Sequence, residues 1–540
     1  MKNFVAISSL LLLSVSAISQ DVNVYWGKAN PISRTADQWL IGERGENVFA
    51  CKRARNKVSI LKYGLKDLQV EGEYVAIGRD DGQGGKPISN DYKYDDIITL
   101  KDVFYISVTK YDKSAKQNSL YIQEIGETGK LTGKLQKLET IDSKSTFNRG
   151  AFDLIESVDS TRLLLVDYPP YDKYSGEKFT FTTFDEHLNQ DKKFQVELPF
   201  KDKNFDLDDI TYAKDGNIYM MAKILLDRKD KVKAEASYYY ELLSVNPNGD
   251  GKVVQYDIKL PEKYIDGIAY KTDDDKDIIC SGLYGNTTGT AKGDISGIFF
   301  MRLNKTTQQV DATGIKDLDK DFIADLTSER KANKGKGISN DFTLRNFIRK
   351  DDGGAVMFAE YRYDYLVTTT TSDGHGGIST RTDHHYVRNN IIAVNINPDG
   401  TIKWCANIPK YQHTVNDNGA YSSYMLAIKG KVLTKADDKI FLVYNDNPTN
   451  MDAARIASGA KLKTMSNSKK STAVLVELSD DGQFTKKTLF SNKDNDATIM
   501  PSHYLRITND EFIVPAYNGG FWCCISFSSA KSKLARIEFK

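Results

Sequence analysis

The clearest repeated unit of the chain is Asp209-Ile-Thr-Tyr-Ala-Lys-Asp-Gly-Asn-Ile-Tyr-Met-Met-Ala-Lys223. Two runs rich in β-branched and aromatic residues flank the segment Lys214-Asp-Gly-Asn217. Such runs favour β-strands, and an Asp-Gly pair supplies the positive φ that a tight turn between antiparallel strands requires. The stretch therefore predicts a β-hairpin.

Hairpins of this kind recur along the whole chain. Each is followed by a second pair of strand-like runs, most plainly at 242–249, 391–400 and 474–482. A repeated unit of four strands with turns between them is typical of β-propeller blades. The eight copies of the first hairpin begin near residues 38, 96, 153, 209, 268, 346, 431 and 504.

The eighth copy is one strand short. Lys533–Phe539 is its third strand and nothing follows it, whereas Val22–Trp26 is a strand with nothing before it. If the N-terminal strand completes the last blade, neither terminus leaves an exposed strand edge. The sequence thus predicts an all-β fold, a single eight-bladed propeller spanning residues 20–540. Seven blades, or two smaller domains, are the alternatives that the pattern leaves open.

A family resemblance supports this fold. The segment Asp215-Gly-Asn-Ile-Tyr219 resembles the core of NHL and related propeller repeats, and the chain as a whole is similar to β-propeller proteins. The pentapeptide is complete in one blade, and the other copies match it only in pattern. The resemblance therefore implies a fold rather than an activity.

The N-terminal residues predict the location of the protein. Residues 1–19 carry a positive start, a short apolar run and small residues before the expected cleavage point, which is typical of a secretory signal peptide. We expect an exported protein, periplasmic or extracellular, without a membrane span.

With 74 basic and 73 acidic residues the formal charge is +1, so no global field attracts nucleic acid. Five cysteines are too few for a disulfide scaffold, and buried thiols are expected.

Three insertions interrupt the repeat, at residues 316–338, 361–387 and 447–471. The second holds two β-favouring runs around a glycine-rich turn, and should extend the middle strands of blade six into a β-arm. An isolated two-stranded ribbon is marginal in water, so a partner protein or another part of this chain should cover it. Because His384 and His385 point to opposite faces of a strand, no metal site is expected here. The candidate partner-binding residues are Tyr363, Tyr365, Leu366, His375, His384 and Tyr386.

A register of acidic residues is the most specific chemical pattern. Asp96, Asp153, Asp209 and Asp266 start the innermost strand in four consecutive blades, at intervals of 57 (153−96), 56 (209−153) and 57 (266−209). The same offset places Arg345 and His503 in blades six and eight. These six residues are candidates for a ligand or a structural cation, and no other cofactor is expected. The alternative is structural, with each aspartate accepting nearby backbone N–H groups.

No sequence motif of a nucleophilic, metalloprotease or nucleotide-binding site occurs, so catalysis is not favoured and no catalytic residue is named. The leading hypothesis is a non-catalytic, protein-binding accessory subunit of an envelope complex, in secretion or at the outer membrane. Its expected partner is another envelope protein. The alternative is a propeller that binds or cleaves carbohydrate at an acidic channel mouth. A quinone- or metal-dependent dehydrogenase is disfavoured because no cofactor ligands can be named.

Overall fold

The computed structural model of the protein describes residues 22–32, 36–80, 82, 86–231, 236–249, 251–272, 277–288, 293–372, 378–429, 438–518 and 530–540. The expected signal peptide at 1–19, His375, Cys523 and Cys524 lie outside these residues. The chain divides into two compact units. One comprises Thr35–Thr313 and Lys334–Gly337, and the other comprises Met1–Arg34, Gly314–Asn333 and Ile338–Lys540.

The hairpin predicted from the opening stretch is confirmed. Strand β15 (Phe205–Tyr212) pairs antiparallel with β16 (Ile218–Leu225), and Tyr212 lies opposite Ile218. Gly216 has a φ of 86°, a conformation that glycine adopts without steric cost. The side chain of Asp215 accepts a hydrogen bond from the Asn217 amide at 2.9 Å. The Asp-Gly pair thus fixes both the turn and the strand register.

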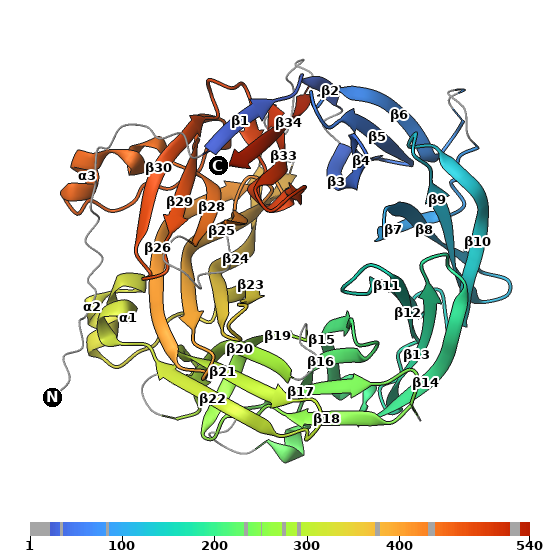
Figure 1. Cartoon of the computed structure of the whole chain (residues 1–540), viewed down its shortest axis with the longest axis horizontal. Helices are drawn as coiled ribbons and strands as arrows, with labels where there is room; N and C mark the ends of the chain where they lie inside the picture. The colour runs from blue at the N-terminus through green and yellow to red at the C-terminus, as the bar shows by residue number, and fades with distance from the viewer. Residues whose placement is uncertain are drawn as a thin grey trace. The chain divides into compact units, whose positions relative to one another are not determined.

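The fold class is also confirmed. The described residues form eight antiparallel sheets with four strand positions each, as in an eight-bladed β-propeller. Seven of the sheets use four consecutive strands, and in the eighth the N-terminal strand β1 takes the outermost position. Seven blades are therefore excluded. We number the blades along the chain, from β3–β6 as blade one to β31–β34 as blade eight (Figure 1).

Blades one to five belong mainly to the first unit, and each uses consecutive strands. Their strands are β3 (Ala36–Arg44), β4 (Asn47–Ala54), β5 (Lys57–Gly64), β6 (Val70–Ile77), β7 (Lys93–Leu100), β8 (Val103–Asp112), β9 (Gln117–Ile125), β10 (Leu131–Asp142), β11 (Ala151–Glu156), β12 (Arg162–Tyr168), β13 (Gly176–Asp185), β14 (Gln190–Lys201), β15, β16, β17 (Tyr238–Val245), β18 (Val253–Asp257), β19 (Lys263–Lys271), β20 (Asp277–Asn286), β21 (Ile295–Asn304) and β22 (Val310–Asp317).

Blades six to eight belong to the second unit, together with three short α-helices in the first and third insertions. These elements are α1 (Lys320–Leu326), α2 (Glu329–Asn333), β23 (Phe342–Arg349), β24 (Ala355–Ser372), β25 (Ile378–Ile396), β26 (Ile402–Val415), β27 (Met425–Lys429), β28 (Lys439–Asp446), α3 (Ala453–Ala457), β29 (Thr472–Leu478), β30 (Phe484–Ser491), β31 (Thr498–Ile499), β32 (Leu505–Arg506), β33 (Glu511–Asn518) and β34 (Ala530–Phe539), with β1 (Val22–Trp26) and β2 (Asn30–Ile32) from the N-terminus.

The core lies between the faces of neighbouring blades. Middle strands such as β20 and β28 are buried almost throughout, so their sequences are nearly continuous apolar runs. Outer strands such as β22 alternate between exposed and partly buried residues. Between blades four and five, for example, Leu242 packs in one cluster with Ile278 and Phe299. The burial that stabilises each blade therefore requires a neighbour.

The N-terminal strand completes blade eight, as predicted. All five residues of β1 pair antiparallel with β34, from Val22 opposite Phe539 to Trp26 opposite Ala535 (Figure 1). The ring of Trp26 meets Phe490 edge to face at 5.2 Å, and the Lys533 ammonium lies 4.4 Å from the centre of the Trp26 ring. Strand β1 thus covers an edge of β34 that would otherwise be open.

Deleting residues 22–32 should therefore destabilise the protein and promote aggregation, because the edge of β34 and the apolar cluster of blades seven and eight become exposed. Thermal unfolding and light scattering measure both effects. Tyr25→Ala, at a side chain that is 44 % exposed, is the matched control and should change stability by less than about 1 kcal/mol. A deletion variant as stable and monomeric as the wild type would contradict this role of β1.

Candidate functional site

The innermost strand of blade four contains a β-bulge at its acidic residues. Leu207 pairs with Ala222 and Asp209 with Met221, so Asp208 has no opposite residue of its own. A bulge of this kind bends the strand and turns side chains to new directions, which is why bulges often adjoin binding sites.

The bulge recurs in five of the eight blades described here, and it changes which residues are equivalent. In blade two, Asp95 and Asp96 together face Ser107, and in blade five the extra residue is Asp266. In the strand register Asp266 therefore occupies the same position as Asp95 and Asp208. The sequence intervals align it instead with Asp96 and Asp209. The first bulge residues are Ile41, Asp95, Asp208, Asp266 and Arg345.

Three of the predicted aspartates accept local hydrogen bonds. Asp96 Oδ1 accepts from the amide of the next residue, Ile97, at 2.8 Å. Asp209 does the same with the amide of Ile210 at 2.9 Å. Asp153, in the one acidic blade without a bulge, accepts from the Tyr168 hydroxyl at 2.8 Å. These contacts fit the structural alternative for the aspartates, in which they hold the backbone of their own blade.

The acidic side chains also influence one another. Burial, the largest cause, raises the pKa of Asp96, and the charge of Asp153 raises it further. Burial likewise raises the pKa of Asp209, with a further contribution from Asp208. Although these side chains are solvent-accessible, the surrounding protein atoms limit their hydration. Blades two and three thus bring Asp96 and Asp153 together, whereas Asp209 has Asp208 as its acidic neighbour.

Sequence reasoning missed several acidic neighbours of these residues. Burial raises the pKa of Asp95, Asp208 and Glu156, and the charge of Asp96 adds to the effect at Glu156. The adjacent pairs Asp95-Asp96 and Asp208-Asp209 are visible in the sequence and mark the bulges. Nothing in the sequence points to Glu156, which accepts a hydrogen bond from the Thr99 amide of the neighbouring blade.

The predicted basic residues lie in the second unit. Arg345 is the extra residue of the bulge in β23, and His503 ends a short 3-10 helix, Pro501–His503. Burial lowers the pKa of His503, and the positive charge of Arg345 lowers it further, so the two side chains are neighbours. Among the residues that the structure describes, no three His, Cys, Asp or Glu side chains are grouped closely enough to hold a metal ion.

The second candidate site is the arm formed by β24 and β25. The two strands pair from Ala355 opposite Ile396 as far as Ser372 opposite Ile378. The pairing of β23 with β24 reaches Tyr361, and that of β26 with β25 reaches His385. Within the described part of the chain, the arm beyond these points is a two-stranded ribbon.

Aromatic side chains gather at the base of the arm. The rings of Tyr363 and Tyr365 stack with centroids 5.4 Å apart, and Tyr365 stacks on His385 at 4.6 Å. Nδ1 of His385 lies 2.9 Å from Nε2 of His413, which β26 supplies. Burial and the neighbouring His385 lower the pKa of His413. Tyr365 and His385 thus join the arm to β26, the fourth strand of the blade.

The distal part of the arm is open to solvent. Leu366 is 62 % exposed and Val367 is 38 % exposed, and the residues at 368–372 and 379–382 are exposed as well. His384 is exposed, and its amide donates to the Asn416 side chain at 2.8 Å. The hydroxyl of Tyr386 donates to the side chain of Asn418 at 3.3 Å. The arm is therefore anchored at its base, and residues 366–372 and 379–382 beyond the base are exposed.

A buried ion pair lies beneath the arm. Lys410 Nζ donates to Glu360 Oε1 at 2.6 Å, and both side chains are fully buried. The Ser423 hydroxyl donates to the second carboxylate oxygen of Glu360, and Lys410 also donates to the side chain of Gln412. Burial lowers the pKa of Lys410, which the Glu360 charge opposes. This network links β24, β26 and the segment before β27.

The cysteines offer no reactive centre among the described residues. Cys51, Cys280 and Cys405 are free thiols, and the first two are buried. Burial raises the pKa of Cys51 and of Cys280, which keeps both thiols protonated at neutral pH. No helix among the described residues has the length and apolar character to cross a membrane.

Comparisons with known proteins found similar solved structures only. No family model matches the chain, and no curated protein matches it. Solved β-propellers are similar to it at low identity. The Dos1 propeller is 8 % identical over 95 % of this chain and 94 % of that one, with a TM-score of 0.41. The propeller domain of the Trilobed protease from Pyrococcus furiosus is 13 % identical over 67 % and 94 %, with a TM-score of 0.32. The Nup133 propeller domain of Vanderwaltozyma polyspora is 11 % identical over 82 % and 99 %, with a TM-score of 0.34.

Asp96→Asn should stabilise the protein at pH 7. The pKa of Asp96 is higher in the folded protein than in the unfolded chain. As pH rises above about 3.9, the Asp96 carboxyl therefore loses its proton first in the unfolded chain, and the free energy of unfolding falls. Asparagine carries no charge, so the variant does not lose this stability at neutral pH. Its free energy of unfolding at pH 7 should exceed that of the wild type by less than about 1 kcal/mol, because the site is accessible to solvent. Thermal unfolding at pH 7 and at pH 4 measures the difference, which should shrink at the lower pH. Asp102→Asn, at an exposed turn, is the control; an equal gain there would refute the assignment.

Lys410→Met should destabilise the protein by roughly 3–5 kcal/mol, because it leaves the Glu360 carboxylate buried without its counter-charge. Urea unfolding measures the loss, and adding Glu360→Gln should restore part of it. Lys403→Met is the matched control, since Lys403 pairs with Asp480 at 2.9 Å on the surface and should cost about 0–1 kcal/mol. Equal effects of the two substitutions would show that the buried pair has no special role.

Proposed function

We propose that the protein is an exported, non-catalytic propeller that binds another protein through the arm of blade six, as an accessory subunit of an envelope complex in secretion or at the outer membrane. Export and a periplasmic or extracellular location are inferred from the composition of residues 1–19. The partner is then another envelope protein. The observation that carries the proposal is the exposed distal arm, whose apolar side chains Leu366 and Val367 are uncovered.

The geometry of the arm favours binding by strand addition. Beyond Arg362, whose amide donates to the Asp341 carbonyl, no strand among the described residues pairs with the outer edge of β24. Such an edge presents alternate N–H and C=O groups that a partner strand satisfies. The run Thr368-Thr-Thr-Thr371 is β-branched and favours an extended backbone. A strand from the partner would cover this edge and convert the ribbon into a three-stranded sheet.

Two ion pairs fix the orientation of the base of the arm. Arg388 is 3 % exposed and binds the Asp364 carboxylate with both terminal nitrogens, at 3.0 Å for Nη2 to Oδ2. The buried pair of Glu360 and Lys410 lies one step further into the blade. Because these residues are already fixed, partner binding costs little conformational entropy at the base of the arm.

Deleting Leu366–Thr382 should abolish partner capture without unfolding the propeller, since residues 366–372 and 379–382 of this span are exposed. The tagged full chain and the deletion variant are used to capture proteins from solubilised envelope of the native host, and captured proteins are then purified and mixed with each variant. Fractionation of the same cells checks the location. Capture of the same proteins by the deletion variant, or recovery of this chain alone by the wild type, would overturn the proposal.

A pair of point variants separates loss of the contact surface from a general effect of added charge. Leu366→Asp places a carboxylate on the exposed arm, and Val310→Asp places one at a 43 % exposed side chain of β22. Both should leave thermal stability nearly unchanged. Only Leu366→Asp should weaken binding of the purified partner, by about tenfold or more.

A further inference from the structure

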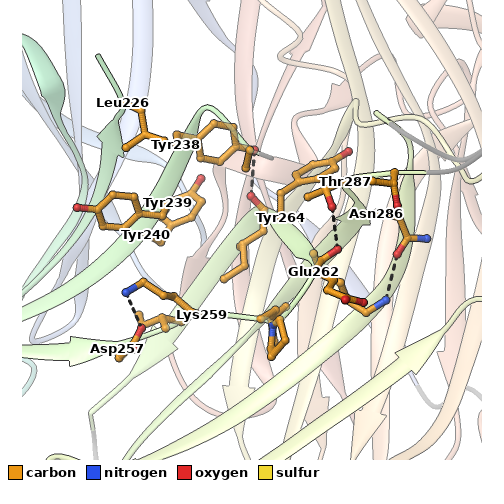
Figure 2. A pocket seen from close by; sticks show the side chains of 17 residues that line it. Leu226, Tyr238, Tyr239, Tyr240, Asp257, Lys259, Glu262, Tyr264, Asn286 and Thr287 are labelled. Carbon is orange, nitrogen blue, oxygen red and sulfur yellow. Dashed lines mark hydrogen bonds and ion pairs between the residues drawn. The ribbon is translucent and has the colours of Figure 1, made fainter. Parts of the chain in front are cut away.

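A pocket of about 1160 Å³ lies between blades four and five, well away in sequence from the arm. It is lined by the start of β17, by the connection from β18 to β19, and by the end of β20 (Figure 2). All of these segments belong to the first unit. A pocket of this size is large enough for a small-molecule ligand.

Tyrosines form one side of the pocket and are held in place by the protein itself. Tyr238 and Tyr240 meet edge to face with ring centres 6.0 Å apart, and the Tyr238 hydroxyl donates to the Ile265 carbonyl at 3.0 Å. The Tyr264 hydroxyl donates to the Asp294 carbonyl at 3.3 Å. Tyr239 and Tyr264 are only partly buried, and Figure 2 shows both among the side chains lining the pocket. The Tyr264 ring is thus held by its hydroxyl, and the Tyr239 ring lies beside Lys259, whose ammonium is 5.8 Å from the ring centre. Both rings keep part of their surface exposed.

The polar side of the pocket is electrically balanced. Its charged lining residues are Asp257, Lys259, Glu262 and Lys263, so two positive and two negative side chains give a formal charge of zero. Lys259 lies 3.5 Å from the Asp257 carboxylate. Lys263 donates to Asn286 Oδ1 at 3.0 Å and lies 4.4 Å from the centre of the Tyr284 ring. Because positive and negative side chains are equal in number, the lining offers no excess of positive charge to an anionic ligand.

We propose that this pocket binds a short neutral oligosaccharide. A sugar ring has apolar C–H faces that pack on tyrosine rings and hydroxyl groups at its edge that exchange hydrogen bonds with amide, hydroxyl and carboxylate side chains. The pocket combines these features, with Tyr239 and Tyr264 as ring surfaces and Asn286 and Thr287 as polar groups at the rim. The site goes beyond the partner-binding arm and does not depend on it.

Calorimetric titration of the full chain with neutral gluco-, xylo-, manno- and chito-oligosaccharides tests the proposal. At least one of these probes should bind, and Tyr239→Ala should weaken its binding about tenfold or more. Tyr174→Ala, at a side chain that is 77 % exposed in blade three, should bind like the wild type. The variant lacking Leu366–Thr382 should bind equally well, which separates this proposal from that of the arm.

Thr287→Val provides a second test if Tyr239→Ala does not fold. The Thr287 hydroxyl donates to the Glu262 carbonyl at 3.0 Å at the rim, and its oxygen can still accept a hydrogen bond from a sugar hydroxyl. Loss of this hydroxyl should therefore weaken sugar binding while leaving the blade intact by circular dichroism. Failure of every neutral oligosaccharide to bind would overturn the proposal. Equal binding by wild type and both pocket variants would do so too, as would a preference of this pocket for acidic saccharides or peptides.

Discussion

The pairing of β1 with β34 is the constraint on which blade eight depends. A β-sheet edge with unpaired backbone groups invites association with other chains, and a blade with only three strands would leave such an edge at the end of the chain. Here five residues from the N-terminus supply the missing strand, and Trp26 packs against Phe490 of blade seven. Residues more than 500 positions apart in sequence thus belong to one sheet, so blade eight forms only after both termini have been made.

The second unit contains buried polar side chains as well as an apolar core. Glu360 and Lys410 are charged groups that would each cost several kcal/mol to bury alone, and their mutual contact with Ser423 and Gln412 offsets that cost. A further buried amide, Asn445, donates to the carbonyls of Tyr421 and Ile499 and so ties blade seven to blade eight. Directional bonds of this kind specify one arrangement of strands, which suits a base that must hold the arm.

The arm and the tyrosine pocket use two different ways of building a binding site on the same repeat. In blade six, two strands are lengthened beyond their neighbours, which leaves backbone groups and apolar side chains uncovered. Between blades four and five, the strands keep their ordinary length and the connecting segments form a pocket instead. Both sites are made at the ends of strands, where a change of sequence does not disturb the apolar faces between blades.

The repeat, the closing strand and the lengthened hairpin can be read from the sequence, because strand periodicity and turn chemistry are local properties. The Asp215-Gly216 turn is an example, since its conformation depends on adjacent residues. The sequence favours eight blades but leaves seven open, and the eight sheets of the structure settle the number. Which acidic residues are equivalent follows from the strand register of the folded protein. The pairs Asp95-Asp96 and Asp208-Asp209 mark two of the bulges in the sequence, but no such pair marks the bulge at Asp266, which aligns with Asp208. The tertiary structure also decided that Glu360 meets Lys410 and that Tyr239 and Tyr264 line one pocket. Those contacts join different strands or blades, and their geometry follows from packing rather than from the residues on either side.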